Sequence, residues 1–280
     1  MVFIGNLLNP KNDYVFHRLF GHLGNEEITK DLIESITKDN ITNITLDCNP
    51  ITEIEILGDK VGLLDIKAKL NNNINCNIEM QIVDEKNIEK RMLFYWSKMY
   101  ISSIKQGQDY SKLEKSIVIL LADYDLKQLK DIKKYMTKWN IREEENTKII
   151  LTDVLELYIL ELNKVDKCLE NKNILNSWIK FINNPKGALE LENKAIKQAR
   201  EELEKISQDK KEQRLTELRE KYIMDQKAMR DAGYDSGLEK GLQQLKQEKL
   251  EIAKKLKSKN IEISVIIEVT GLTKEEIEKL

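Results

Sequence analysis

The sequence contains few of the residue types that mark disulfide-rich or zinc-binding proteins. Among its 280 residues are three cysteines, three prolines and two histidines, and aromatic residues make up 6%. Cys48, Cys76 and Cys168 stand far apart and form no CxxC pair, which argues against a disulfide framework and favours reduced, packed thiols. Without a neighbouring cysteine pair, His17 and His22 do not indicate a zinc site.

Long hydrophobic runs are also absent. No stretch approaches the roughly 18 consecutive uncharged apolar residues that indicate a transmembrane helix, so we expect no membrane span. Residues 1–5 carry neither a basic segment nor a signal-peptide cleavage site. We therefore expect a cytoplasmic protein rather than a secreted one.

The chain has no strong charge of either sign. Its formal net charge is −2, although charged residues make up 34% and hydrophobic residues 41%. This composition is typical of a globular protein with long, solvated helices. Because a basic field over the whole chain is absent, any contact with nucleic acid would need a local basic patch.

Two helices and three strands are predicted near the start of the chain. Residues 12–38 have a helical period interrupted at Gly21, and Asn25 is positioned to cap the second helix. Alternation of apolar and polar residues then predicts three strands that follow one another as an antiparallel meander. The alternating segments are 51–57, 63–70 and 74–83.

Helix and strand signals continue to alternate after the meander. Residues 86–106 return to a helical period, and the apolar run in 115–122 suits a buried strand. Residues 147–163 contain two further strand-like pieces around Thr152. This order predicts an α/β or α+β domain over residues 1–165, with a mixed central sheet.

The remainder of the chain is predicted to be helical. Residues 166–235 form a helical region in which Pro185–Gly187 marks a break, and Gly233–Gly241 is a candidate hinge. Residues 236–280 form a distinct C-terminal segment whose last two helices resemble a helix-turn-helix. The helices expected in this segment are Leu250–Lys259, Ile261–Val269 and Thr273–Leu280.

The hairpin around Asn71–Asn73 carries the most informative pattern. If the three asparagines form the loop, Leu70 pairs with Ile74. The same register places Asp65 opposite Glu79 on the polar face of the hairpin. A two-residue loop would set apolar side chains against polar ones, so the pattern selects the three-residue loop.

Two carboxylates directly opposite each other repel, and this repulsion must be offset. A shared proton, a lysine such as Lys67 or a bound cation could each offset it, and oxygen ligands on rigid strands suit Mg²⁺ or Mn²⁺. The competing interpretation is an exposed polar face on which the carboxylates interleave with Lys67 and Lys69. The residues alone leave both interpretations open.

Asp65, followed about fourteen residues later by Glu79-Met80-Gln81, resembles the D…ExK signature of PD-(D/E)XK nucleases, with glutamine in the lysine position. More narrowly, the chain resembles the Rpn family of recombination-promoting nucleases, also described as transposases. The likeness covers roughly residues 9–165, and the helical tail is also familiar from this family. The matching stretches are Asp13–Phe16 with Leu19–Gly21, Leu64–Ala68, Asn77–Gln81, Arg91–Tyr100, and Gly107 with Tyr110.

The resemblance implies an α/β fold with a PD-(D/E)XK restriction-endonuclease-like core, followed by an all-α C-terminal region. It also implies a DNA endonuclease that uses Mg²⁺, or another divalent cation such as Mn²⁺ or Ca²⁺, in recombination, mobile elements or defence. Asp65 and Glu79 would then be metal ligands. Gln81 would orient water or donate a hydrogen bond, because a neutral amide lacks the charge of lysine. Asp13 is the candidate additional acidic residue, and a helix N-cap is its alternative role.

Three further residues are candidates for contact with phosphate or DNA. Arg91 and Tyr95 lie four positions apart on the helix that follows the hairpin, so they share a face. Lys67 lies on the polar face of the first hairpin strand. The alternative for the helix pair is a core tyrosine beside a surface arginine.

A non-catalytic function is the alternative to the nuclease. In that case the helical C-terminal region would act in DNA binding or in protein interaction. The last helix, Thr273–Leu280, holds three glutamates against two lysines, whereas helices that read DNA bases usually present Arg, Asn or Gln. We therefore favour an interaction role for this end, and expect the long helices to mediate homo-oligomerisation.

Overall fold

The computed structural model describes residues 6–47, 65–84, 86–167, 173–187 and 193–280. The chain divides into two compact units, Met1–Glu220 and Lys221–Leu280. The predicted strand at 51–57 lies outside the described residues. The domain boundaries predicted after residues 165 and 235 stay a prediction.

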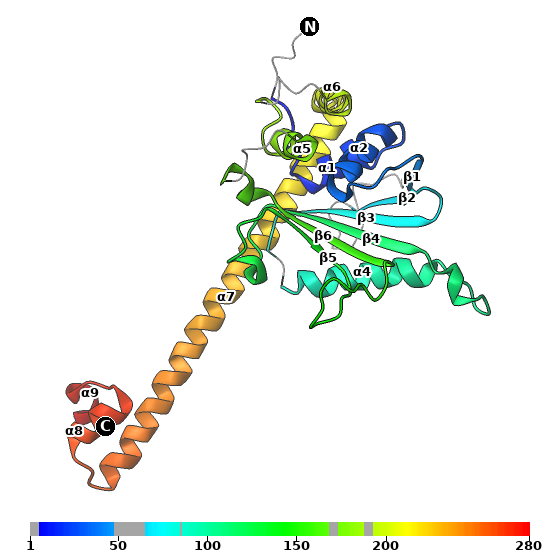
Figure 1. The fold of residues 1–280 in the computed structure, drawn as a ribbon. Helices are drawn as coiled ribbons and strands as arrows, with labels where there is room; N and C mark the ends of the chain where they lie inside the picture. The colour runs from blue at the N-terminus through cyan, green and yellow to red at the C-terminus, as the bar shows by residue number, and fades with distance from the viewer. Residues whose placement is uncertain (1–5, 48–64, 85, 168–172, 188–192) are drawn as a thin grey trace. The chain divides into compact units, whose positions relative to one another are not determined.

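A six-stranded mixed sheet forms the centre of the first unit (Figure 1). Its order is β1-β2-β3-β4-β6-β5. Neighbours β1, β2 and β3 run antiparallel, β3, β4 and β6 run parallel, and β5 runs antiparallel to β6. The predicted α/β fold with a mixed sheet is thus confirmed. The strands are β1 (Ile44–Asp47), β2 (Ile66–Leu70), β3 (Ile74–Gln81), β4 (Lys115–Ala122), β5 (Met136–Trp139) and β6 (Leu155–Glu161).

One strand was not predicted, and one strand prediction needs correction. In the described residues the antiparallel meander begins with β1, which was not predicted. Of the two strand-like pieces in 147–163, only the second joins the sheet, as β6. The first makes an isolated bridge between Arg142 and Ile150, and its apolar side chains are exposed, so no sheet face covers them.

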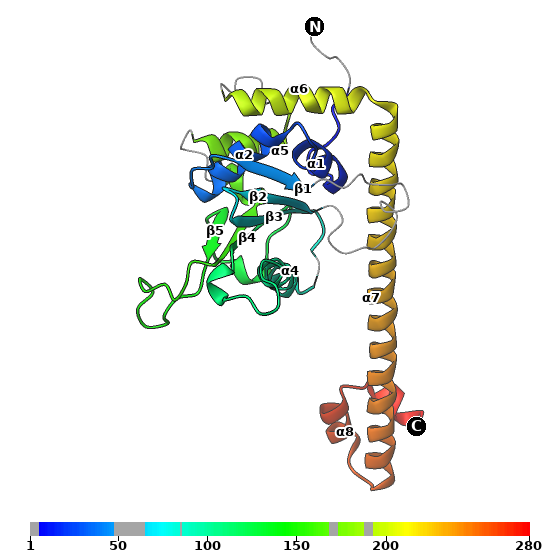
Figure 2. The ribbon, with the colours of Figure 1, turned by 90° about the vertical axis from the view of Figure 1, so that its right-hand side faces the viewer.

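Helices cover both faces of the sheet, as Figure 2 shows from the side. On one face, Ile117 and Ile119 of β4 pack in a cluster with α1, α2, α5 and α6. On the other, Val118 and Leu120 pack against α4. Burial of both faces explains why β4 is apolar from Ile117 to Ala122. The helices of this unit are α1 (Asp13–Phe20), α2 (Glu26–Thr37), α4 (Ile88–Ser102), α5 (Ile174–Asn183) and α6 (Lys194–Gln208), with 3₁₀ turns η1 (Tyr110–Lys112), η2 (Lys127–Leu129) and η3 (Leu162–Lys167).

The ends of the first two helices lie close to the predicted positions. Gly21 is the C-cap of α1, and Asn25 is the N-cap residue of α2. The Asn25 side chain does not cap α2, however. Its Nδ2 donates to the carbonyl of Leu19 at 2.8 Å, and so ties α2 to the end of α1.

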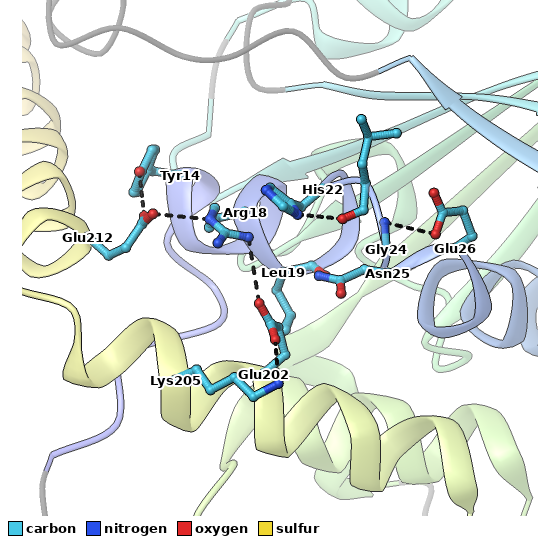
Figure 3. Close-up of polar contacts among 11 residues, drawn as sticks. Tyr14, Arg18, Leu19, His22, Gly24, Asn25, Glu26, Glu202, Lys205 and Glu212 are labelled. Carbon is cyan, nitrogen blue, oxygen red and sulfur yellow. Dashed lines mark hydrogen bonds and ion pairs between the residues drawn. The ribbon is translucent and has the colours of Figure 1, made fainter.

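Helix α1 is held by polar contacts from α6 and from the start of α7 (Lys210–Ser258), as Figure 3 shows. The Tyr14 hydroxyl donates to Glu212 Oε2 at 2.6 Å, and Arg18 Nε donates to Glu212 Oε1 at 3.1 Å. Arg18 also lies 3.7 Å from Glu202 of α6. These contacts join residues about 190 positions apart in the sequence, so α6 and the first turn of α7 pack against α1.

Helix α7 is continuous through the predicted hinge. It has 49 residues and includes Gly233–Gly241 without a break. Each helical glycine costs about 1 kcal/mol relative to alanine. The hinge prediction is wrong because the long flanking segments, rich in Glu, Lys, Gln and Leu, are strong helix formers that carry the helix through the glycines.

The second unit has a small core of its own. Ala253 of α7 packs with Ile266, Leu272 and Ile277. These residues come from α8 (Ile263–Thr270), α9 (Lys274–Glu278) and the turn between them. The predicted pair of terminal helices is therefore present, and Thr273 begins the second with a capping box to Glu276. Among the described residues, no helix is long and apolar enough to cross a membrane.

Candidate functional site

The hairpin has the register that the polar pattern predicts. Leu70 pairs with Ile74 across the loop, and Ile66 pairs with Ile78. Asn71 and Asn72 adopt left-handed φ angles of 49° and 66°, which asparagine tolerates better than most residues. Continued by one residue, the register sets Asp65 opposite Glu79.

The end of the hairpin's polar face that carries the candidate metal ligands is buried. Glu79 is 3% exposed, Asp65 is 7% exposed and Gln81 is 9% exposed. On β3 these odd-numbered positions share a face with Leu120 of β4, which α4 covers. The alternative of an exposed polar face is therefore wrong for Asp65 and Glu79, and these two carboxylates lie opposite each other out of solvent, where their repulsion is strong.

An arginine of α4 offsets part of this charge. Arg91 forms an ion pair with Glu79, and its side chain is 22% exposed. Its guanidinium carbon lies 5.7 Å from the centre of the Tyr95 ring. The sequence placed Arg91 and Tyr95 on one helix face, and their contact confirms it. A cation from the protein thus lies against one of the two candidate metal ligands.

Burial raises the pKa of Asp65 above its ordinary value. The positive charges of Arg91 and Lys67, and a long hydrogen bond of 3.5 Å from Asn77 Nδ2, act in the opposite direction. Burial also raises the pKa of Tyr95, to about 12, with the nearby charge of Asp65 adding to the effect. The surroundings of Asp65 therefore disfavour its charged form unless another cation is added.

Gln81 and Lys67 differ in solvent exposure, since Gln81 is buried and Lys67 is exposed. Gln81 ends β3, and its Nε2 donates to the carbonyl of Val83 at 3.2 Å. Lys67 is exposed on β2, with Asn77 and Asp47 as its strand partners. Its charge lowers the pKa of Asp65, so it remains within electrostatic range of the carboxylates.

Asp13 lies in the first turn of α1 and is paired with the helical region. Arg219 of α7 donates to both of its carboxylate oxygens, with Nη2 2.7 Å from Oδ2 and Nε 3.0 Å from Oδ1. The N-cap alternative is wrong, because the Asn12 side chain accepts from the backbone N–H groups of Tyr14 and Val15. Asp13 nevertheless raises the pKa of Asp65, so its charge acts on the hairpin.

The family model for the PD-(D/E)XK nuclease family transposases matches residues 10–233. The chain belongs to this family. The match covers the whole sheet, both hairpin carboxylates and the first half of α7. It agrees with the resemblance that the hairpin residues carry. No curated protein sequence and no solved structure matches the chain.

PD-(D/E)XK nucleases generally use divalent cations, and the donor set of this hairpin fits one. Asp65 and Glu79 offer carboxylate oxygens from adjacent strands, which suit a hard cation such as Mg²⁺. Within the described ranges, no group of three or more His, Cys, Asp or Glu residues could hold a metal. Two carboxylates are nevertheless enough for Mg²⁺, which usually keeps several waters and shares its remaining positions with substrate phosphate.

Two neighbours of the candidate site were not predicted as site residues. Asn77 lies two positions before Glu79, and its place on the same polar face was a usable signal. Arg219 is separated from Asp13 by 206 positions, and no local pattern could connect them.

Proposed function

We propose that this protein is a metal-dependent endonuclease that hydrolyses phosphodiester bonds in DNA. The observation that carries the proposal is the buried pair Asp65 and Glu79, set opposite each other by the β2–β3 register within a PD-(D/E)XK family chain. Burying two facing carboxylates is costly without a compensating cation. A divalent cation bound between the two carboxylates would supply the compensating positive charge.

In this proposal Asp65 and Glu79 hold the cation, as Mg²⁺ or as Mn²⁺ or Ca²⁺. Bound there, it would polarise the scissile phosphate and lower the pKa of an attacking water. Gln81 would orient that water through a hydrogen bond, since its amide can donate and accept but carries no charge. Asp13 would act from α1 through its charge, held in place by Arg219.

Arg91 has two roles in this account. Without a divalent cation it neutralises Glu79. When a divalent cation takes over that neutralisation, the guanidinium can bind a phosphate oxygen, for which its planar set of donors is well suited. Tyr95 supports the arginine from the same helix face. Lys67, exposed on β2, adds positive charge near the DNA.

A cleavage assay tests the proposal. Supercoiled plasmid is incubated with the purified full-length chain in Mg²⁺ or in EDTA. We expect nicking in Mg²⁺ only, and a loss of at least about 100-fold for Asp65→Asn and for Glu79→Gln, the scale of removing one charge-stabilising group. Asp153→Asn and Glu144→Gln, both at exposed positions, are the matched controls and should cut like the parent chain.

Cleavage that persists in EDTA, or that survives both site variants, would rule out this site. Absence of cleavage with any divalent cation would favour the second function, a non-catalytic protein that binds DNA or other proteins through its helical region.

We also propose that the chain self-associates through α7. Leu238, Leu245 and Ile252 recur every seven residues and are 52%, 49% and 46% exposed. Apolar residues at this spacing pair one helix with a second copy of itself in a coiled coil. Charged residues of both signs alternate beside them, as Glu239, Lys240, Lys246 and Glu248 do. Because charges of both signs lie beside the apolar positions, two identical helices could form ion pairs with each other.

A further inference from the structure

The segment that leads from β4 into β5 carries a local basic patch. Residues 127–138 contain five lysines and one acidic residue, Asp131, in a chain whose net charge is −2. The five lysines are all exposed. They are Lys127, Lys130, Lys133, Lys134 and Lys138.

This segment lies at the same end of the sheet as the candidate site. The parallel strands β3, β4 and β6 have their carboxyl ends at this end of the sheet, and the antiparallel strands β2 and β5 begin at the same end. Asp65 directly precedes β2, and Gln81 ends β3. The segment that carries the lysines follows β4 at that end of the sheet and leads into β5 there.

The segment also packs on the same face as the site. Leu126 and Leu129 are buried in a cluster with Met92 of α4, the helix that supplies Arg91. In addition, Gln128 Nε2 donates to Glu89 Oε1 of α4 at 3.2 Å. The segment that carries the lysines therefore packs against α4, the helix that also supplies Arg91.

A buried ion pair fixes the backbone of the segment. Glu161 accepts from the N–H of Leu126 at 2.8 Å and from Lys164 Nζ at 2.6 Å. The same Nζ donates to the carbonyls of Leu129 at 2.7 Å and Ile132 at 3.1 Å. Since the Glu161 side chain is only 1% exposed and that of Lys164 is 10% exposed, these bonds are shielded from water. These bonds hold the backbone of the segment in place. A backbone that is already ordered loses less entropy when the lysines bind a ligand.

Three of the five lysines have no carboxylate partner in the part of the chain that the structure describes. Among the described residues, no carboxylate lies within ion-pair distance of Lys127, Lys130 or Lys134, whereas Lys138 pairs with Glu156 at 3.1 Å. Lys134 also lines an open pocket of about 520 Å³. It is lined by Ile132, Lys133, Lys134, Met136, Thr137 and Lys138.

We propose that Lys127, Lys130 and Lys134 bind the phosphate backbone of duplex DNA and hold it at the end of the sheet where Asp65 and Glu79 lie. This inference rests on the proposed function, in which DNA is the substrate. Lysines that contact phosphates position the duplex without reading its sequence. Each contact releases condensed counterions, so the lysines add affinity that falls with salt.

The test is binding of a fluorescent random-sequence duplex, measured by anisotropy in EDTA over a range of salt concentrations. The variant is Lys127→Gln with Lys130→Gln and Lys134→Gln. We expect its Kd at about 0.1 M salt to rise at least about tenfold, and its slope of log K against log salt to shrink by about two to three units. Thermal unfolding should be unchanged, because the three side chains are exposed.

The control changes the same charge at the other end of the sheet. Lys105, Lys112 and Lys148 are exposed, and they precede the amino ends of β4 and β6. Replacing all three with glutamine should leave both the Kd and the salt slope near those of the parent chain.

Four outcomes decide the proposal. Loss of binding in the first variant alone supports it, and equal loss in the control variant overturns it. If the parent chain cuts plasmid and the first variant binds DNA unchanged, this surface is wrong while the nuclease stands. If the parent chain cuts nothing but the first variant loses binding, the surface stands and the nuclease does not.

Discussion

Glu79 is the residue whose charge most needs a partner. It is 3% exposed, and it forms an ion pair with the Arg91 guanidinium. A divalent cation bound at Asp65 and Glu79 would supply positive charge to the same carboxylate. Arginine and cation are therefore two ways of neutralising one buried group.

This equivalence predicts a metal-dependent stability defect. Arg91→Met removes the guanidinium that neutralises Glu79, and breaking a buried ion pair by removing one partner costs about 3–5 kcal/mol. We expect the loss measured by urea unfolding to approach this range in EDTA and to shrink in millimolar Mg²⁺. Lys90→Met, at an exposed position on the same helix, is the control and should unfold alike in both conditions. A defect of equal size in EDTA and in Mg²⁺ would contradict the shared role.

The site residues also differ in how much of their position and burial could be predicted from the sequence. Asp65, Glu79 and Gln81 lie on one strongly alternating hairpin, so their common face and their register could be predicted. Their burial could not, because it depends on α4 packing over them. The pairing of Arg91 with Glu79 follows from that packing and was likewise invisible in the sequence.

At the scale of elements, long and regular patterns were predicted and short ones were not. Strands β1 and β5 have four residues each, too few for a periodic signal. The glycines of α7 were read as a hinge, but helix propensity summed over the flanking segments outweighs them. The junction of α1 with α7 depends on contacts between distant residues, which no local pattern reports.

That junction makes a testable contribution to stability. Asp13 and Arg219 are largely buried, with side chains 15% and 17% exposed. Arg219→Met should therefore cost about 1–3 kcal/mol of unfolding free energy by leaving a charged group without its partner. A double-mutant cycle with Asp13→Asn, measured by urea unfolding, should give a coupling of at least about 0.5 kcal/mol.

The control for this cycle is Lys211→Met, an exposed position one turn or more from the contact on the same helix. It should not couple to Asp13→Asn. If the effects of Asp13→Asn and Arg219→Met simply add, α7 does not hold α1 through this ion pair.

At the scale of the whole molecule, self-association is the property that α7 leads us to expect. Replacing Leu238 and Leu245 together with glutamine removes apolar side chains from two successive heptads, which should dissociate a coiled coil. Light scattering should then find a multiple of 32.7 kDa for the parent chain and a single chain for the variant. Lys240→Gln with Lys254→Gln, on the opposite helix face, should keep the parent mass. A parent chain that is monomeric at micromolar concentration would exclude this proposal.

The central claim concerns the cation that Asp65 and Glu79 would hold, and direct measurement of Mn²⁺ binding tests it without relying on turnover. Calorimetric titration of the full chain should find about one Mn²⁺ site per chain, since two carboxylates on neighbouring strands can share one ion. That site should be lost in Asp65→Asn and in Glu79→Gln and kept in Asp153→Asn. Stoichiometric Mn²⁺ binding that survives both hairpin variants would contradict the account.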